Sequence, residues 1–486
     1  MARGLRNTIS IVLVCLILMA GSPVLSAHQA SQACYTTQQG GENSTQSMPS
    51  KYDPRETGMV SAVKAQGKYS TCWAFAGIAT LESFLIKHGF EDNSVNLSEQ
   101  HLIWWSRRDA SGFGWNRGAV NGGFGVTITG YFSSANAPIC NKDMEYKPDM
   151  GISVPQDFYK HKRLYRVTDI EYLKDDRDKI KSAIYNDGAV CTHIYQDFDD
   201  LHSRHKKYYG SNNFSYFYPC RNGCVLNHQV AVVGWDDNYS KQNFNEKNRP
   251  KNDGAWLVKN STGPEFYDKG FMWVSYEDGV MFKNINNFNI TFCIRGVEKE
   301  EDTKVYQADE YGAVSNYFLT NEKGVPYKKL TAMNVYDFDK EYNKLDSIMI
   351  NTACSGAEYK IYYAYMNKKE PVLDDVKLVL LSQGIIEYDG YMTCKLDTPF
   401  ILPEGKGAIL VEIDSTMTET MPNIGCDVDC IVLKSGIPEL LFKSNSKKDI
   451  SYVLHEGKFI NAKLFGINSP VDYNLVNLSI KAVTKR

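Results

Sequence analysis

The pattern of apolar residues changes near Phe292, and this change limits the architecture that the 486-residue chain can adopt. Before it, segments with apolar residues at helical spacing alternate with strand-like runs. After it, helical periodicity disappears, and short β-type runs follow one another with turn residues between them. These runs cover residues 330–336, 345–351, 359–365, 376–381, 390–396, 407–413, 430–432 and 474–482. The sequence therefore predicts an α+β domain over residues 51–290 and an all-β sandwich domain over residues 291–486.

Charge excludes one broad class of function. The chain has 54 lysines and arginines and 57 aspartates and glutamates, which gives a net charge of −3 with both signs mixed along the sequence. A protein that binds nucleic acid or an anionic membrane through its surface charge would show a basic cluster. We therefore expect neither nucleic acid nor an anionic membrane surface as a partner.

The first 50 residues have the composition of a targeting segment followed by a linker. Arg3 and Arg6 precede an apolar stretch over residues 9–20, and small residues continue to Ala27. This pattern predicts a signal peptide over residues 1–27, and its apolar stretch is too short to span a bilayer comfortably. Residues 28–50 are rich in Gln, Ser, Thr and Gly and predict a flexible arm. We expect an exported, extracellular protein without a stable membrane span.

A cysteine stands at the start of an apolar, helix-period segment. Cys72 begins a pattern that runs to Leu85, Ser70 or Thr71 can cap its start, and Gly89 can end the helix. A helix start places positive backbone charge at the sulfur, which predicts a lowered thiol pKa. The Cys72 N–H and the Gln66 side chain could both donate to a developing oxyanion. A small, inert buried thiol is the alternative that this segment alone leaves open.

Two polar residues further along the chain complete a candidate catalytic set. His228 opens an apolar β-type run that reaches Trp235, and Asn260 ends a second run that begins at Ala255. A neutral imidazole can take the Cys72 proton to form a thiolate–imidazolium pair, and the side-chain oxygen of an asparagine can fix the ring tautomer. Of the nine histidines, only His228 opens a strand of this kind. The set predicts nucleophilic catalysis by a cysteine.

The order of these segments resembles the papain family of cysteine peptidases. The matching pieces are Gln66, six residues before the cysteine, Cys-Trp-Ala-Phe from Cys72, Asn-His before an apolar strand with Gly-Trp, and Val-Lys-Asn-Ser around Asn260. The resemblance implies a papain-like two-lobed catalytic domain that hydrolyses peptide bonds through a thioester acyl-enzyme. In this reading Cys72, His228, Asn260 and Gln66 are the catalytic residues.

The same resemblance implies a place for the substrate. Gly122 and Gly123 would bind extended substrate backbone, which the absence of a Cβ permits. A plain turn is the alternative for this glycine pair. The carbonyl of Asn227 would lie next to the scissile bond.

The chain departs from the family pattern at two places. Tyr69 stands where relatives usually have a cysteine, and residues 119–121 lack its partner, so that disulfide is missing. Thr262 stands where a tryptophan usually covers the bond between histidine and asparagine. This change predicts a more exposed His228–Asn260 hydrogen bond and a narrower active pH range. It also creates a glycosylation sequon on Asn260, and we expect burial or a host without this modification to keep the residue free.

The C-terminal runs resemble the lectin-like domain that follows the catalytic domain in some bacterial and archaeal papain-type peptidases. Gly390-Tyr391-Met392-Thr393 and Leu478-Ser479-Ile480-Lys481-Ala482 carry part of this likeness. A carbohydrate or another cell-surface ligand is one candidate partner for the domain. Tyr391 and Tyr363 could stack on a sugar if they were exposed, but packing within the sheet is the reading that we prefer.

The chain has 12 cysteines, and their spacing suggests disulfides rather than metal sites. The two Cys-x-x-x-Cys pairs, 220/224 and 426/430, are candidates in an exported protein, with free thiols as the alternative. Cys191 and His193 alternate along a predicted strand, which explains them more simply than metal ligation does. We expect no metal and no cofactor.

These observations predict a secreted, papain-type cysteine endopeptidase that acts on protein or peptide substrates. One alternative is a catalytically weak adhesin or ligand-binding protein in which the C-terminal sandwich is the functional part. Another is an acyl transferase that uses the same thioester, with an amine in place of water.

Overall fold

The computed structural model divides the chain into two compact units, Met1–Pro49 and Ser50–Arg486. The described residues are 48–107, 112–116, 122–147, 161–203, 206–212, 214–221, 223–283, 288–321, 323–366, 377–434, 437–463 and 475–486. The predicted signal peptide and nearly all of the predicted arm lie outside them, as do residues 119–121. The second unit is described below.

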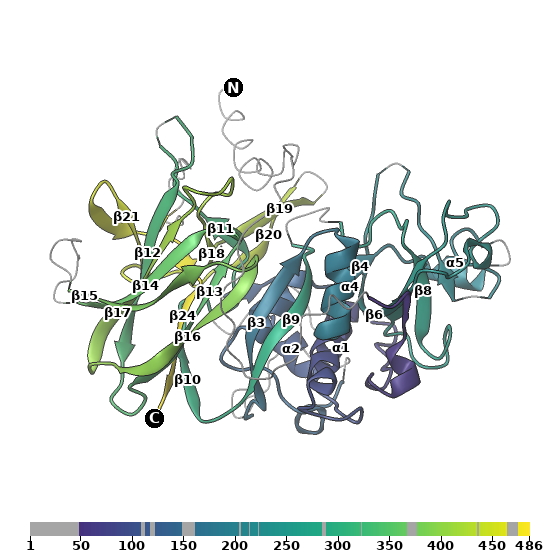
Figure 1. Cartoon of the computed structure of the whole chain (residues 1–486), viewed down its shortest axis with the longest axis horizontal. Coiled ribbons are helices and arrows are strands. Elements are labelled where there is room, and N and C mark those ends of the chain that lie inside the picture. The colour runs from purple at the N-terminus through teal and green to yellow at the C-terminus, as the bar shows by residue number, and fades with distance from the viewer. Residues whose placement is uncertain are drawn as a thin grey trace. The chain divides into compact units, whose positions relative to one another are not determined.

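Among the described residues, five α-helices belong to the first half of this unit, and Figure 1 shows their arrangement. They are α1 (Cys72–Lys87), α2 (Glu99–Trp105), α3 (Gly125–Phe132), α4 (Arg177–Asn186) and α5 (Phe198–His202). Helix α1 is buried over nearly its whole length, because it packs against α2, α3 and the strands β4, β6 and β9. Side chains cap the starts of two of these helices: the Ser98 hydroxyl accepts from the His101 N–H at 3.0 Å, and the Asp176 carboxylate accepts from two N–H groups of the first turn of α4.

The strands of the first half form one side of a large mixed sheet. They are β1 (Lys51–Tyr52), β3 (Tyr165–Leu173), β4 (Val190–Ile194), β5 (Ser215–Tyr216), β6 (His228–Asp236), β7 (Ala255–Lys259), β8 (Phe271–Ser275) and β9 (Thr291–Lys299). Strand β2 (Gly114–Trp115) lies outside this sheet and pairs with a C-terminal strand, Ile437–Lys443. The order from the middle outward is β3-β9-β4-β6-β7-β8-β5, and β1 pairs with β6. Thr291, the first residue after the predicted domain boundary, begins β9, which lies between β3 and β4.

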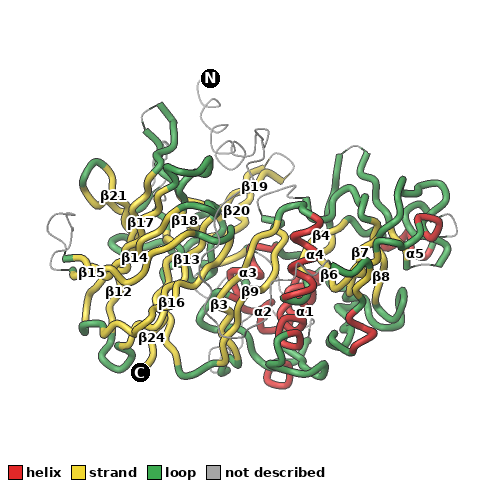
Figure 2. The backbone as a smooth tube through the Cα atoms, viewed as in Figure 1, coloured by secondary structure: helices red, strands yellow, loops and turns green. Residues whose placement is uncertain are grey.

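The second half consists of strands and loops among the described residues, as Figure 2 shows. The strands are β10 (Thr303–Tyr306), β11 (Ser315–Tyr317), β12 (Lys329–Phe338), β13 (Lys344–Thr352), β14 (Glu358–Tyr365), β15 (Leu378–Ile385), β16 (Gly390–Ile401), β17 (Gly405–Asp414), β18 (Ile424–Asp427), β19 (Cys430–Lys434), β20 (Ile437–Lys443), β21 (Ser451–His455), β22 (Lys458–Asn461), β23 (Asn477–Leu478) and β24 (Ile480–Lys485). One six-stranded sheet has the order β15-β14-β17-β12-β21-β22. A β-rich C-terminal domain is therefore confirmed.

The two halves share a sheet and a hydrophobic core. Strands β10, β24, β13 and β16 continue the large sheet, because β16 pairs with β3 through Gly390↔Glu171 and Tyr391↔Ile170. Asp169 on β3 strengthens this junction, since its Oδ1 accepts from the Tyr388 hydroxyl at 2.6 Å and the Thr393 N–H at 2.9 Å. One cluster of buried apolar side chains runs from α1 into the C-terminal strands. The C-terminal domain is thus packed onto the first half as part of one folded unit.

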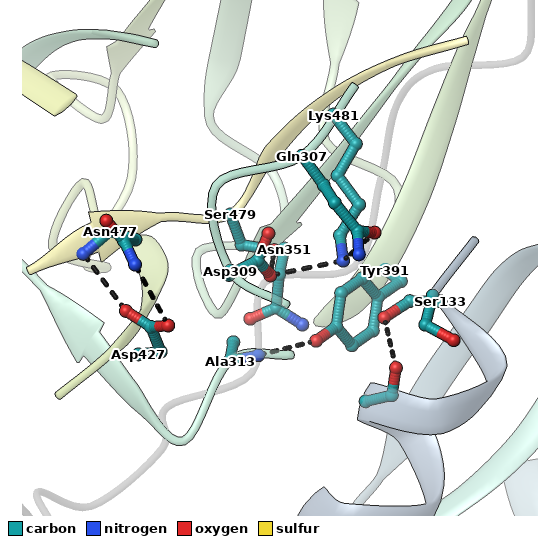
Figure 3. Close-up of polar contacts among 12 residues, drawn as sticks. Ser133, Gln307, Asp309, Ala313, Asn351, Tyr391, Asp427, Asn477, Ser479 and Lys481 are labelled. Atoms are coloured by element: carbon teal, nitrogen blue, oxygen red, sulfur yellow. Dashed lines mark hydrogen bonds and ion pairs between the residues drawn. The ribbon is translucent and has the colours of Figure 1, made fainter. Parts of the chain in front are cut away.

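Tyr391 and its neighbours form a buried polar network at this junction (Figure 3). The Tyr391 hydroxyl accepts from the Ala313 N–H at 2.8 Å. Tyr391 and Tyr363 are both buried, so the preferred prediction of packing within the sheet is confirmed and neither ring offers a face to a sugar. Close by, Lys481 pairs with the Asp309 carboxylate at 3.2 Å, with both side chains out of contact with solvent.

The predicted disulfide between Cys220 and Cys224 forms. Cys426 and Cys430 are buried and form no disulfide, so the second candidate pair is not bonded. Cys191 is also a buried free thiol, and His193 Nε2 lies 2.8 Å from the Lys283 carbonyl oxygen. Within the described ranges, no three His, Cys, Asp or Glu side chains gather as metal ligands would, and no helix is both long and apolar enough to cross a bilayer.

Candidate active site

A cleft of about 680 Å³ brings the predicted site residues together. Six of the seven line it: Gln66, Cys72, Gly122, Gly123, Asn227 and His228. The seventh, Asn260, lies below the cleft surface and bonds to His228. Cys72 begins α1, His228 begins β6, and Asn260 follows β7, so the packing of α1 across β6 and the pairing of β6 with β7 place the three residues in one region.

Cys72 is 8% exposed at the first position of α1. Burial raises the pKa of its thiol, and hydrogen bonds from the backbone N–H groups of Gln229, Trp73 and Cys72 itself lower the pKa by less. The predicted lowering of the thiol pKa is therefore wrong for the substrate-free chain, because desolvation of the thiolate outweighs the helix start. Thr71 occupies the N-cap position but makes no side-chain cap. Its hydroxyl shares a 2.7 Å hydrogen bond with the Tyr146 hydroxyl instead.

The His228–Asn260 pair has a defined tautomer. His228 Nε2 lies 2.8 Å from Asn260 Oδ1, and the Ser261 N–H donates to the same oxygen at 2.8 Å. Because a backbone N–H can only donate, the atom between them is an acceptor, and His228 Nε2 must carry the hydrogen. Nδ1 of the ring is then free to accept a proton. Burial lowers the pKa of His228 to about 4, and the bond to Asn260 opposes this shift.

This pair is buried, contrary to the exposure predicted from Thr262. His228 is 3% exposed and Asn260 is 4% exposed. The ring of Phe198 stands edge-on to the imidazole, with centroids 5.5 Å apart and an interplanar angle of 89°. An aromatic side chain from α5 therefore covers the histidine although the usual tryptophan is absent. Burial of Asn260 also removes the sequon from reach in the folded chain.

Gln196 is a member of this site that the sequence did not reveal. Its Oε1 accepts from Asn260 Nδ2 at 3.3 Å, and its Nε2 donates to the Tyr209 hydroxyl at 3.0 Å and to the Tyr267 hydroxyl. Its backbone exchanges two hydrogen bonds with the Asn227 side chain, at 2.8 and 3.0 Å. Gln196 thus contacts Asn260, which bonds to His228, and Asn227, which precedes His228 in the chain. Its only sequence signal is its place just after the strand that ends at residue 194.

Gln66 is held from three sides at the mouth of α1. Its Nε2 donates to the Tyr69 carbonyl at 2.6 Å, and its Oε1 accepts from the Ser261 hydroxyl at 2.6 Å. Its backbone N–H donates to the Ser261 carbonyl at 2.8 Å. An amide nitrogen carries two hydrogens, so one remains beside the cleft after the bond to Tyr69 is made.

The two glycines of the loop differ in what they require. A Cβ on Gly123 would lie 2.2 Å from the indole of Trp73, so only glycine lets the loop approach α1 this closely. A Cβ on Gly122 would meet no atom within 4 Å. The cleft is therefore open beside Gly122, where an extended backbone has room.

A buried ionic cluster fixes α1 against the strand that carries Asn260. Lys64 pairs with Glu82 of α1 at 2.8 Å and with Glu99 at 2.7 Å. Ser61 links the same Glu82 to Lys259, because its hydroxyl donates to the carboxylate at 2.6 Å and accepts from Lys259 Nζ at 2.7 Å. Burial lowers the pKa of Lys259 to about 8. These bonds connect the second half of α1, through Ser61, to the end of β7.

Comparison with known proteins covers both halves. The family model for papain family cysteine proteases matches residues 48–291, and the model for the lectin like domain matches residues 305–484. Ananain from Ananas comosus is 27% identical over 233 residues, which cover 46% of this chain and 55% of ananain. Cathepsin S from Bos taurus is 29% identical over 237 residues, which cover 48% of this chain and 62% of that protein. The match thus spans less than two thirds of each of these enzymes.

A solved structure matches most of the chain. The protease and lectin-like domains of Cwp84, a surface layer associated protein of Clostridium difficile, are 32% identical to it with a TM-score of 0.77. The match covers 90% of this chain and 89% of that one. The predicted fold, a papain-like catalytic domain followed by a β-rich lectin-like domain, is confirmed. The chain belongs to the papain family of cysteine proteases and is a cysteine peptidase with a C-terminal lectin-like domain.

Proposed function

We propose that the chain is a secreted endopeptidase whose catalytic residues are Cys72, His228 and Asn260. The observation that carries this proposal is the 2.8 Å bond between His228 Nε2 and Asn260 Oδ1, with Cys72 in the same cleft. This bond leaves His228 Nδ1 as the base on the ring. The raised pKa of the thiol and the lowered pKa of the imidazole favour the neutral form of each group before substrate binds.

Acylation begins as the Cys72 sulfur attacks the scissile carbonyl carbon and its proton passes to His228 Nδ1. The carbonyl oxygen becomes an oxyanion that accepts from the Cys72 N–H and from the second hydrogen of Gln66 Nε2. His228 then gives the proton to the leaving amine, the C–N bond breaks, and a thioester remains on Cys72. Asn260 keeps the ring in the required tautomer throughout.

Deacylation repeats these steps with water. His228 Nδ1 takes a proton from water, the hydroxide adds to the thioester carbon, and the sulfur leaves and recovers the proton. Gly122 and Gly123 would hold the extended substrate beside Cys72, with the Asn227 carbonyl next to the scissile bond. Three features support an extracellular location: the predicted signal peptide over residues 1–27, the Cys220–Cys224 disulfide, and the surface-layer association of Cwp84.

The test is hydrolysis of a panel of fluorogenic peptides by the wild type, Cys72→Ala and Asn260→Ala. We expect hydrolysis by the wild type, none by Cys72→Ala, and a strongly reduced kcat for Asn260→Ala. Hydrolysis that survives Cys72→Ala would overturn the proposed site. Adding a competing amine separates hydrolysis from acyl transfer, since a transferase would form the amide product in preference to the free acid.

A further inference from the structure

Two buried polar side chains lie at the floor of the cleft and have no part in the mechanism above. His193 of β4 is 0% exposed and Gln229 of β6 is 4% exposed. They are direct partners in the antiparallel β4–β6 register, so their side chains lie on the same face of the sheet. Both line the cleft that contains Cys72.

Three polar atoms of these side chains have no hydrogen-bond partner among the described residues: His193 Nδ1 and both Gln229 Oε1 and Nε2. Folded proteins pair nearly all such buried atoms, because an unpaired one has lost its water without compensation. Three together, in a cleft that faces substrate, indicate groups that a ligand is meant to satisfy.

The hydrogen-bond chemistry of each atom is fixed or nearly so. His193 Nε2 lies 2.8 Å from the Lys283 carbonyl oxygen, which can only accept, so this nitrogen carries the ring hydrogen. His193 Nδ1 is therefore a bare acceptor. Gln229 adds one further acceptor, Oε1, and one donor, Nε2. The cleft floor thus offers two acceptors and one donor side by side.

We propose that this floor is the binding site for one uncharged, hydrogen-bonding side chain of the substrate, an amide such as glutamine or asparagine above all. Its N–H groups would donate to His193 Nδ1 and Gln229 Oε1, and its oxygen would accept from Gln229 Nε2. A hydroxyl side chain would satisfy part of this set. The inference rests on the proposed function and adds the class of substrate to it.

Other side chains fit less well. No aspartate or glutamate occurs among the described residues that line the cleft. The lining residues include one lysine, Lys68. A lysine or arginine side chain would therefore be buried without a counter-ion. A carboxylate would face the lone pair of His193 Nδ1. An aliphatic side chain of equal size would leave all three polar atoms without a hydrogen bond and would still exclude water from them.

The test measures kcat/KM for peptides that are identical except for one side chain before the scissile bond. Glutamine, methionine, lysine and glutamate are placed in turn at each of the positions upstream of that bond. At one position we expect glutamine to exceed methionine by about a hundredfold, because buried polar groups reject an analogue that leaves them unpaired. Lysine and glutamate should also fall below glutamine there.

Two variants connect this preference to the named side chains. His193→Leu and Gln229→Met should each reduce the glutamine-to-methionine ratio at that position to about one-tenth or less of its wild-type value. Gln242→Met, at an exposed residue that does not line the cleft, is the matched control and should leave the ratio unchanged. Thermal unfolding shows whether each variant is folded. Titration of the reactive thiol gives the concentration of active protein, by which each rate is divided.

The outcomes separate this inference from the proposed function. If peptides are cleaved, but kcat/KM with methionine equals or exceeds kcat/KM with glutamine at every position, this inference is overturned and the proposed function stands. A wild-type ratio that both variants leave intact would overturn it too. If no peptide is cleaved and Cys72 does not react with a thiol reagent, the proposed function itself fails.

Discussion

Gln196→Met tests whether the hydrogen bonds beyond Asn260 matter for catalysis. Methionine has nearly the length of glutamine, so it fills the same buried space, but it removes the acceptor for Asn260 Nδ2. Among the described residues, that nitrogen would keep its contact with the Met272 sulfur at 3.4 Å, and sulfur is a weak acceptor. Asn260 would then gain freedom to rotate away from His228.

The size of the effect follows from the bond that is lost. A neutral hydrogen bond contributes about 1 kcal/mol, and a buried donor left without a partner costs about 1–3 kcal/mol. If about 1–2 kcal/mol of this falls on the productive orientation of His228, kcat falls by roughly 5- to 30-fold. KM should change little, because Gln196 lies outside the set of residues that line the cleft.

The assay measures kcat and KM separately, together with the pH profile of Cys72 alkylation and the free energy of unfolding. Gln196→Glu keeps an oxygen acceptor for Asn260 Nδ2, and the two tyrosine hydroxyls can turn to donate to it, so we expect it to recover most of the lost kcat. Gln242→Met is the control for the same substitution at an exposed site. If Gln196→Met lowers stability but keeps the wild-type kcat and alkylation profile, Gln196 has only a structural role and the reasoning is refuted.

Three further predictions follow from single side chains. Gly123→Ala places a methyl group against the Trp73 indole, so the loop must move. We expect kcat/KM to fall by about tenfold while the free energy of unfolding changes little. An unchanged kcat/KM would show that the loop does not hold substrate. Burial lowers the pKa of His101 from its usual 6.5 to about 3, so its contribution to stability is present above pH 6.5 and is lost as the pH falls. Denaturant titrations should therefore show that His101→Gln loses less unfolding free energy between pH 6.5 and 4 than the wild type does. An equal loss in the two proteins would contradict this. Lys481→Met leaves Asp309 buried without its partner and should cost about 3 kcal/mol of unfolding free energy, whereas a gain in stability would mean that desolvation dominates the pair.

The three residues that we propose as catalytic could be predicted because each lies in a local pattern. Cys72 begins a helix-period segment, and His228 and Asn260 mark the start and the end of two strand-like runs. The positions of these residues in their elements are set by nearby sequence, and the pairing of β6 with β7 then brings His228 and Asn260 together. Gln196 has no such pattern, because its role depends on a side-chain bond to a residue 64 positions away.

Two of the incorrect predictions depended on tertiary burial. The thiol pKa rises because Cys72 is desolvated, and a helix-start argument contains no information about depth. The His228–Asn260 bond is covered by Phe198, which comes from a different segment than the expected tryptophan. The pairing of β16 with β3 joins residues more than 200 positions apart, so no local pattern predicts that the two halves share one sheet.

The most direct test of the account is to find which thiol reacts with a cysteine-directed epoxide. The described residues include eight cysteines outside the disulfide, all of which are buried except Cys140. Brief reaction at neutral pH followed by peptide mass mapping should give one adduct, on Cys72, in the wild type and almost none in His228→Phe. Adducts spread over several cysteines, or labelling of Cys72 that persists in His228→Phe, would contradict the claim that Cys72, His228 and Asn260 act as one catalytic site.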